Sequence, residues 1–327
     1  MAASRPIALL FAVLATGGLA GCSAPGNGWA ERATQLDVLL GREGAGDGIR
    51  IAILDTGIDL GHPSLRHLAN GDQRDGELRA YRDFVGGGTT PTDESGHGTF
   101  IAGLLVGRPA HGLRSLTGGS DVQGLVPDAE LMVGRICPHG DCSLYVLRQG
   151  LEWALAGGAD IISLSLGFET EELQRNPSAV EILRPLLEKA ERRGVLVVAA
   201  AGNEASGLAL FPAREPSVLA VGDVGSDLRP RHAGLCRSGK PDVLAPGEAI
   251  VGPALPDGLL SMKGSSAAVP FVVAAAAVLM AETPGWRDED RLELVRTAIE
   301  STALHVDSAC PGILQAEAAR RAIALAP

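Results

Sequence analysis

The chain has 327 residues, of which 46% are hydrophobic and 20% charged, a composition typical of a globular protein with a sizeable core. Length alone suggests about two domains, although an α/β fold of this size can be one domain. The net charge is −11 and there is no long basic run, so we expect no nucleic-acid partner.

The first 22 residues read as a targeting segment rather than as part of the fold. One arginine precedes an apolar run of secretory-signal length, too short for a membrane span. The run ends in LAGC, residues 19–22, which resembles the bacterial lipobox. The resemblance implies a lipoprotein signal peptide at 1–21 and lipid attachment at Cys22. An ordinary signal peptide with a coincidental cysteine and an uncleaved anchor are the alternatives.

Lipidation would place the protein in the cell envelope, with the membrane as a partner through the lipid anchor. Ser23, rather than an acidic residue, follows the cysteine. In a Gram-negative source this resembles outer-membrane sorting. We therefore expect the periplasmic face of the outer membrane or the cell surface.

Export exposes the other four cysteines to an oxidising compartment. Cys137 and Cys142 bracket the short stretch PHGD, which a disulfide could close, and Cys236 and Cys310 would then be the remaining pair. Spacing alone leaves the connectivity open. The alternative is a metal site, whose ligands would be Cys137, His139, Asp141 and Cys142. We expect no metal, because a structural zinc site usually shows a second matching ligand pair.

Residues 22–47 are polar and glycine-rich with one weak helical patch, and they read as a tether and lead-in. Beyond them, apolar patterns and turn signals alternate between strand and helix. In chain order they predict a strand at 49–57, a helix at 99–107, a surface loop at 107–124, a strand at 130–136, a helix at 143–158, a strand at 159–167, a helix at 178–194, strands at 195–203 and 217–224, and helices at 266–282 and 288–302.

Repeated strand–helix–strand units predict an α/β fold with a mostly parallel central sheet and helices on both faces. Ligands of such sheets gather at the carboxyl ends of the strands. Asp55, Gly167 and Asn203 all lie at such ends. A site is therefore expected at that edge of the sheet.

Three residue types needed for acyl transfer stand in suggestive places. Asp55 follows a buried strand, His97 lies between two glycines before an apolar helix, and Ser266 lies at the start of the last long apolar helix. A serine hydroxyl becomes a good nucleophile when an imidazole takes its proton, and a carboxylate orients that imidazole. Individually, each residue is more often a turn former or a helix cap. Together, in the order Asp, His, Ser, they favour catalysis.

Four stretches carry a specific resemblance to the subtilisin family of serine proteases, the subtilases. AILDTGIDLGHPSL and GHGTFIAG resemble the family's aspartate and histidine motifs, VVAAAGNE its oxyanion-asparagine motif and GSSAAVP its serine motif. The match runs from about residue 48 to 320. It implies a single subtilisin-like catalytic domain at 48–327 that hydrolyses peptide bonds as a serine endopeptidase through an acyl-enzyme.

The resemblance assigns roles residue by residue. Aligned on Gly264, Ser265 replaces the family's threonine and Ser266 takes the place of the nucleophile. Asp55 is implied as the orienting acid, His97 as the general base and then acid, and Asn203 as the oxyanion donor. The segments implied to contact substrate are Ser165, Leu166, Gly167 and Gly202.

Leu210 is expected to narrow the pocket for the residue before the cleaved bond, so that a small or medium apolar side chain fits best. The chemistry is expected to need no cofactor. We expect a monomer whose partner is a peptide or protein substrate. Ser64 replaces an aspartate that often ligates calcium in the family, so that calcium site is not predicted.

Other protease and hydrolase classes fit poorly. Aspartic proteases need a second D-T-G or D-S-G and a β-rich fold, and an α/β-hydrolase needs G-x-S-x-G, whereas the motif here is G-x-S-x-A. One alternative stays open, a catalytically latent subtilase-like protein that binds peptides. Its support is that residues 23–54 are too few for the family's usual pro-domain.

Overall fold

The computed structural model describes residues 27–39, 44–69, 77–110, 114–115, 123–204, 207–284 and 288–326. Cys22 and the expected signal peptide lie outside these residues. Of the expected loop at 107–124, the structure describes residues 107–110, a short strand, β3 (Arg114–Ser115), and residues 123–124. No helix within the described ranges is long and apolar enough to cross a membrane.

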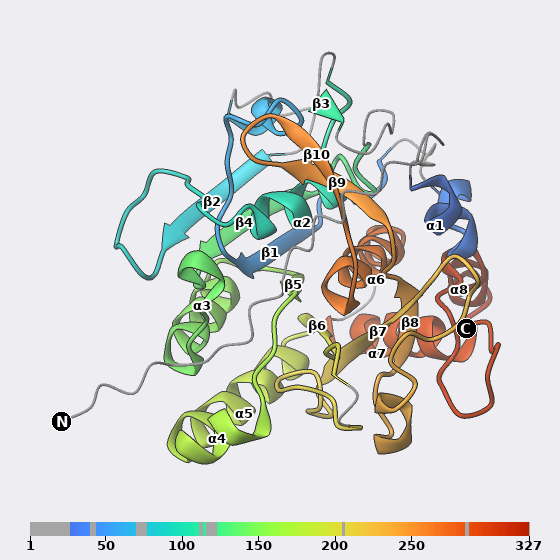
Figure 1. Ribbon diagram of the computed structural model, residues 1–327. Helices are drawn as coiled ribbons and strands as arrows, with labels where there is room; N and C mark the ends of the chain where they lie inside the picture. Colours follow the sequence, from blue (N-terminus) through green and yellow to red (C-terminus); the bar gives the residue numbers. More distant parts are fainter. Residues whose placement is uncertain are drawn as a thin grey trace.

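A seven-stranded sheet forms the centre of the molecule, and every neighbouring pair in it is parallel (Figure 1). The strands in spatial order are β2 (Glu77–Asp83), β4 (Glu130–Arg135), β1 (Arg50–Asp55), β5 (Ile161–Leu164), β6 (Leu196–Ala200), β7 (Val218–Val224) and β8 (Val243–Pro246). The predicted parallel sheet is confirmed.

Alternate residues of each central strand serve opposite faces of the sheet. In β1, Ile51 and Ile53 belong to one buried cluster, whereas Ala52 and Leu54 belong to another. Both faces are therefore covered, as continuous apolar strands require.

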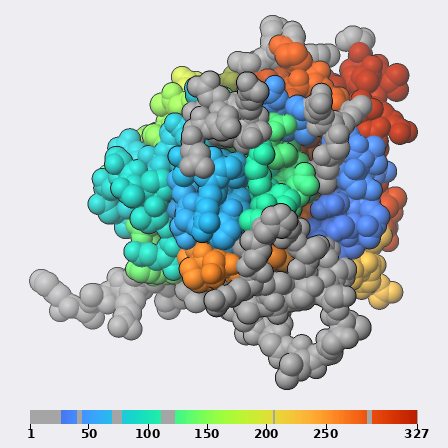
Figure 2. Space-filling view, turned by 90° about the horizontal axis from the view of Figure 1, so that it is seen from above, coloured from blue at the N-terminus to red at the C-terminus, as the bar shows by residue number. Residues whose placement is uncertain are grey.

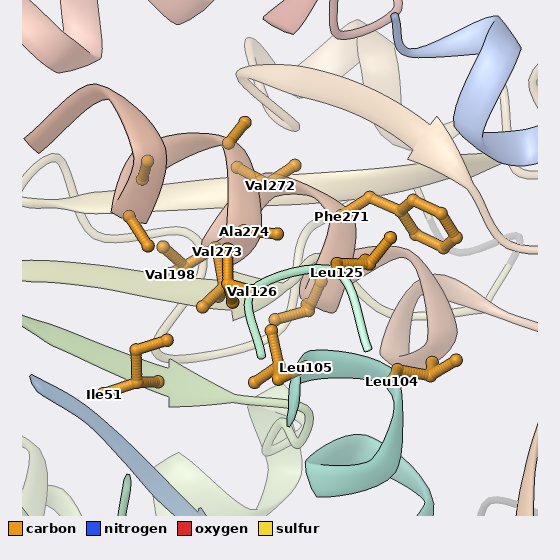
Figure 3. Close-up of a cluster of buried hydrophobic side chains, with 14 of the residues drawn as sticks. Ile51, Leu104, Leu105, Leu125, Val126, Val198, Phe271, Val272, Val273 and Ala274 are labelled. Carbon is orange, nitrogen blue, oxygen red and sulfur yellow. The ribbon is translucent and has the colours of Figure 1, made fainter. Parts of the chain in front are cut away.

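One face carries α2 (His97–Val106), α6 (Ser265–Ala281) and α7 (Asp288–Ser301). All residues of α6 up to Met280 are buried, because α2 and α7 enclose it against the sheet. Side chains of α6 from Phe271 to Ala274 lie in one cluster with Leu104 and Leu105 of α2 (Figure 3). This packing fixes the start of α6 relative to the start of α2.

The opposite face carries α3 (Leu144–Ala156), α4 (Thr170–Arg175) and α5 (Pro177–Arg192). Beside the sheet, β9 (Ile250–Ala254) and β10 (Gly258–Met262) form a hairpin, and β10 also pairs in parallel with β3. Short 3₁₀ turns complete the described chain at η1 (Leu36–Val38), η2 (Arg66–Ala69), η3 (Pro138–Gly140) and η4 (Leu235–Ser238).

The part of the expected lead-in that the structure describes is packed onto the domain. After α1 (Gly28–Ala33), Leu36 and Leu39 are buried in the large cluster. The side chain of Gln315 donates to the Ala33 carbonyl at 2.8 Å, just before α8 (Ala316–Ala324). The two helices accordingly lie together on one flank of the molecule, blue beside red (Figure 2).

Two disulfides join the four cysteines in the arrangement that the spacing suggested. Cys137 bonds Cys142 across a separation of 5 residues, and Cys236 bonds Cys310 across 74. The proposed alternative, a metal site at the first pair, is wrong because both thiols are consumed. Within the described residues, no group of three or more His, Cys, Asp or Glu side chains could hold a metal ion.

Candidate active site

The carboxyl edge of the sheet and the first turns of two helices converge at one place (Figure 1). Asp55 is the last residue of β1, and His97 is the first residue of α2. Ser266 lies in the first turn of α6, and Asn203 follows β6. The topology therefore brings the four residues singled out in the sequence to the same edge.

The carboxylate and the imidazole are directly hydrogen-bonded. His97 Nδ1 lies 2.7 Å from Asp55 Oδ1. Asp55 is only 3% exposed, and its Oδ1 also accepts the Thr56 N–H at 2.7 Å. Because a carboxylate only accepts, the bond places the ring proton on Nδ1. Nε2 is then the nitrogen that can take a proton from a hydroxyl.

A second buried carboxylate, Asp93, shapes the turn that presents His97. Its Oδ1 accepts the Gly96 N–H at 2.8 Å, and its Oδ2 accepts both the Thr99 N–H at 2.8 Å and the Thr99 hydroxyl at 2.6 Å. Gly96 has φ +84°, a left-handed conformation that favours glycine. Asp93 thus fixes the entry into α2.

The surroundings of His97 raise its pKa. Burial opposes the charged form, but the nearby carboxylates of Asp55 and Asp93 outweigh burial and raise the pKa of His97 above its usual value. An imidazolium formed during a reaction would therefore be stabilised here. This is the electrostatic requirement for a general base that must later act as an acid.

The two adjacent serines have different surroundings. Ser265 donates its hydroxyl to Asn203 Oδ1 at 3.0 Å, accepts the Gly202 N–H at 3.1 Å, and donates its own N–H to Asn203 Oδ1 at 2.8 Å. The Ser266 hydroxyl instead donates to the Ser165 carbonyl at 3.0 Å. Ser265 is thus a structural bridge, whereas Ser266 makes a single neutral hydrogen bond through its hydroxyl.

Reciprocal bonds join the start of α6 to the end of β5. The Ser165 hydroxyl donates back to the Ser266 carbonyl at 3.0 Å. Next to this contact, Gly264 has φ +112°, and a Cβ on it would lie 2.7 Å from Asn203 Nδ2. Only glycine lets the Asn203 amide approach the helix start so closely.

The segments expected to contact substrate enclose one side chain. A Cβ on Gly167 would lie 2.6 Å from Leu210 Cβ, and a Cβ on Gly202 would lie 2.7 Å from Leu210 Cγ. Leu166 is buried in the core beneath. Leu210 therefore occupies the space between the two glycine backbones.

The disulfide loop after β4 lies at the same edge of the sheet. Pro138–Gly140 forms a 3₁₀ turn, and Asp141 follows in extended conformation with φ −85° and ψ 115°. The Cys137–Cys142 bond closes this short loop.

Two residues of the site were not singled out in the sequence. Asp93 reads as an exposed turn aspartate in TDES but is 8% exposed. Thr56 donates its hydroxyl to Asp93 Oδ1 at 2.9 Å and accepts the Gly98 N–H at 2.8 Å. The sequence signal that could have indicated Asp93 was its position four residues before His97. An aspartate at such a spacing is common in turns, so this signal alone is weak.

The subtilase family profile matches residues 46–319. Subtilisin Savinase from Lederbergia lenta is 32% identical over 298 residues, which cover 90% of this chain and 98% of that protein. An alkaline protease from Alkalihalobacillus alcalophilus is also 32% identical over 298 residues, covering 90% of this chain and 70% of that protein.

Solved structures agree with this relationship. A mutant of the protease domain of PatA superposes with a TM-score of 0.67 at 26% identity, covering 86% of this chain and 98% of that chain. The prenylagaramide maturation protease PagA has the same fold, with a TM-score of 0.67 at 24% identity over 89% of this chain and 98% of that chain. The chain therefore belongs to the subtilase family and is a serine endopeptidase.

Proposed function

We propose that this endopeptidase works through an Asp55–His97–Ser266 triad and an acyl-enzyme. The observation that carries the proposal is the 2.7 Å bond from His97 Nδ1 to Asp55 Oδ1, at the sheet edge where Ser266 lies in the first turn of α6. The bond sets the imidazole tautomer that a serine nucleophile needs.

In this mechanism Ser266 Oγ attacks the peptide carbonyl carbon and its proton passes to His97 Nε2. Asp55 stabilises the resulting imidazolium through Nδ1–H. The tetrahedral intermediate collapses when His97 returns the proton to the leaving amine, which frees the first product and leaves an ester on Ser266. Water then attacks the ester with the same proton transfers.

The Ser266 hydroxyl must turn away from the Ser165 carbonyl, to which it donates at 3.0 Å, before it can donate to His97. Breaking one neutral hydrogen bond of this kind costs on the order of 1 kcal/mol. That cost is small beside the barrier lowering of an enzyme. The observed hydroxyl orientation is therefore compatible with a resting state.

Asn203 is proposed as an oxyanion donor. Its Oδ1 accepts both hydrogen bonds from Ser265, so the amide orientation is set and Nδ2 remains to donate to the developing charge. The backbone N–H of Ser266, in the first turn of α6, is the proposed second donor.

The proposed substrate preference follows from Leu210. Because it lies between Gly167 and Gly202, space for the side chain before the scissile bond is reduced there. Ser165 and Leu166 complete the proposed contact surface. We expect a small or medium apolar residue at this substrate position.

A fluorophosphonate probe tests the nucleophile directly. Soluble protein from residue 23 onward, produced with disulfides intact, is expected to form an adduct at Ser266 that mass spectrometry can locate. Ser266→Ala should abolish labelling, and His97→Ala should slow it strongly. Ser265→Ala changes the adjacent hydroxyl and should still label at Ser266, more slowly than the wild type because the hydroxyl bond to Asn203 is lost. An adduct at Ser265, or no adduct on folded protein, would reject the proposed triad.

Membrane anchorage through a lipid on Cys22 is also proposed, and it rests on the LAGC sequence. Residues 23–26 alone separate Cys22 from Asn27, so this link spans at most about 18 Å. Asn27 is tied to β9 by two hydrogen bonds with the Val251 backbone, each 2.8 Å. A lipid on Cys22 would therefore hold the domain close to the membrane surface. We propose that the anchored protein is a monomer.

Membrane fractionation tests the anchor. The full chain should sediment with envelope membranes and incorporate labelled palmitate, whereas Cys22→Ala should lose the label. Ser23→Ala is the matched control and should keep it. A wild-type chain that takes up no lipid would reject the anchor without affecting the proposed catalytic mechanism.

A further inference from the structure

A second carboxylate–imidazole pair lies at the same edge of the sheet. His232 Nδ1 lies 2.7 Å from Asp223 Oδ1, the same distance as in the Asp55–His97 pair. Asp223 is the penultimate residue of β7 and is 3% exposed. His232 lies in the loop after β7 with about a quarter of its side chain exposed (26%). The proposed mechanism uses neither residue.

Two glycines, Gly247 and Gly264, lie between this pair and Asn203, the proposed oxyanion donor. A Cβ on Gly247 would lie 2.5 Å from Asp223 Cβ and 2.7 Å from the Gly264 carbonyl oxygen. The Gly264 N–H donates to the Gly247 carbonyl at 2.7 Å. On its other side, Gly264 packs against the Asn203 amide. Asp223 and the Gly264 backbone therefore border the same small space, the one that a side chain on Gly247 would fill.

The charges around His232 favour its protonated form. The hydrogen bond that His232 Nδ1–H donates to Asp223 raises the pKa of His232 against the effect of burial, and the charges of Asp223 and Glu204 add to this rise. Glu204 directly follows Asn203 in the chain. In this loop and its neighbour, Arg231 pairs with Asp227 and Glu248, and the charge of Arg229 also acts on Asp227. Arg237 lies beyond His232 in η4 and is exposed.

A buried carboxylate in this position has an electrostatic consequence. An uncompensated negative charge near the oxyanion donors opposes the negative charge that develops in the transition state, and low-dielectric surroundings strengthen the effect. A protonated His232 cancels that charge. A neutral His232 keeps the hydrogen bond through Nδ1–H but leaves the charge of Asp223 uncompensated.

We propose that His232 is a positioning residue for peptide hydrolysis. Its positive charge neutralises Asp223, which lies behind Gly264 and the Asn203 amide packed on it, and thereby supports oxyanion stabilisation. The proposal rests on the proposed oxyanion role of Asn203. It requires that kcat fall at alkaline pH as His232 loses its proton, while substrate binding changes little.

Two variants separate charge from packing. His232→Gln removes the imidazolium and keeps an N–H donor, so kcat at pH 7.5 should fall about 5- to 10-fold with KM within about twofold. The double variant His232→Gln with Asp223→Asn also removes the carboxylate charge. It should recover kcat to within about twofold of the wild type and lose the alkaline decline. Arg231→Gln is the matched control, because it removes a neighbouring exposed cation and should leave kcat unchanged.

The readout is kcat and KM of the purified chain on a chromogenic peptide from pH 6 to 10. A His232→Gln variant with wild-type kcat and an unchanged alkaline limb would overturn the proposal. So would a double variant that remains as slow as the single one. Asn203→Ala, measured alongside, should lower kcat about 100- to 1,000-fold, the usual effect of losing one oxyanion donor. If Asn203→Ala has no effect, the proposed role of Asn203 itself fails.

Discussion

Asp93 lies four residues before His97 and acts on that imidazole in two ways. It binds the backbone of the turn that presents His97, and its charge contributes to the raised pKa of His97. As the proposed base, His97 must be neutral to accept the Ser266 proton. Activity should therefore rise with pH through a midpoint above the ordinary histidine value of about 6.5.

Replacing Asp93 by Asn tests this electrostatic contribution. The amide removes the negative charge and keeps one of the two acceptor oxygens, so the pKa of His97 should fall and the acidic limb of the kcat/KM profile should move to lower pH. Glu94→Gln is the matched control, since Glu94 is the adjacent, half-exposed carboxylate. The profile is measured from pH 5 to 9. An acidic limb at the wild-type position in Asp93→Asn would contradict the account.

Leu210 carries the prediction about specificity. Replacing it by Ala removes the branch that lies against Gly167 and Gly202, so larger side chains before the cleaved bond should gain kcat/KM relative to small ones. A change of about 10- to 200-fold is reasonable, since one or more methylenes in an apolar pocket count for about 1–3 kcal/mol. Leu208→Ala, at an exposed position two residues away, is the control. A peptide library cleaved with the same preference by Leu210→Ala and wild type would reject the role.

At the scale of elements, the sequence predicted what is locally encoded. Buried strands such as β1 and β6 are continuous apolar runs, and α6 is apolar all around. The local sequence pattern was therefore enough to predict these elements. Strand β2 reads ELRAYRD and is partly exposed at the edge of the sheet. It exists because β4 offers a pairing edge, which no local pattern reveals.

The same reasoning applies to the site. Family motifs located Asp55, His97, Asn203 and Ser266, whose convergence follows from parallel strands ending at one edge. The pairing of Asp223 with His232 was not predicted, because it depends on a loop that folds back onto the end of β7. Burial of a polar residue is a tertiary property, so a turn aspartate and a core aspartate look alike in sequence.

His62 links the turn after β1 to the β9–β10 hairpin. Its Nε2 donates to the Gly258 carbonyl at 2.9 Å, while its Nδ1 accepts the Ser64 N–H at 3.2 Å. Burial is the main reason that the pKa of His62 is lowered. The ring is therefore held neutral between the two elements.

This arrangement predicts a pH-dependent contribution to stability. Since the folded pKa lies below the unfolded value of about 6.5, the unfolded state binds more protons as the pH falls below that value. The contribution is complete above pH 6.5 and is lost toward the folded pKa. The free energy of unfolding of the wild type should exceed that of His62→Gln more at pH 7.5 than at pH 5. A difference that is constant with pH, measured by urea unfolding, would show that His62 does not titrate on unfolding.

At the scale of the whole molecule, covalent links hold segments that the sheet alone does not join. Cys236 in η4 is bonded to Cys310, and Cys310 packs in a small cluster with Leu244 and Ile313. The bond thus fastens the loop that carries His232 to the chain between α7 and α8. The Cys137–Cys142 bond, in contrast, closes a loop within one short segment.

The two bonds should differ in their effect on stability, because the conformational entropy removed from the unfolded chain grows with loop length. Separations of 74 and 5 residues correspond to about 4 and about 2 kcal/mol. Replacing Cys236 and Cys310 by serine should lower Tm by roughly 7 °C, about twice the loss from replacing Cys137 and Cys142. The short-loop variant is the matched control, since both variants remove two sulfurs. Equal losses in thermal and urea unfolding would show that local packing, rather than loop closure, determines what each disulfide contributes.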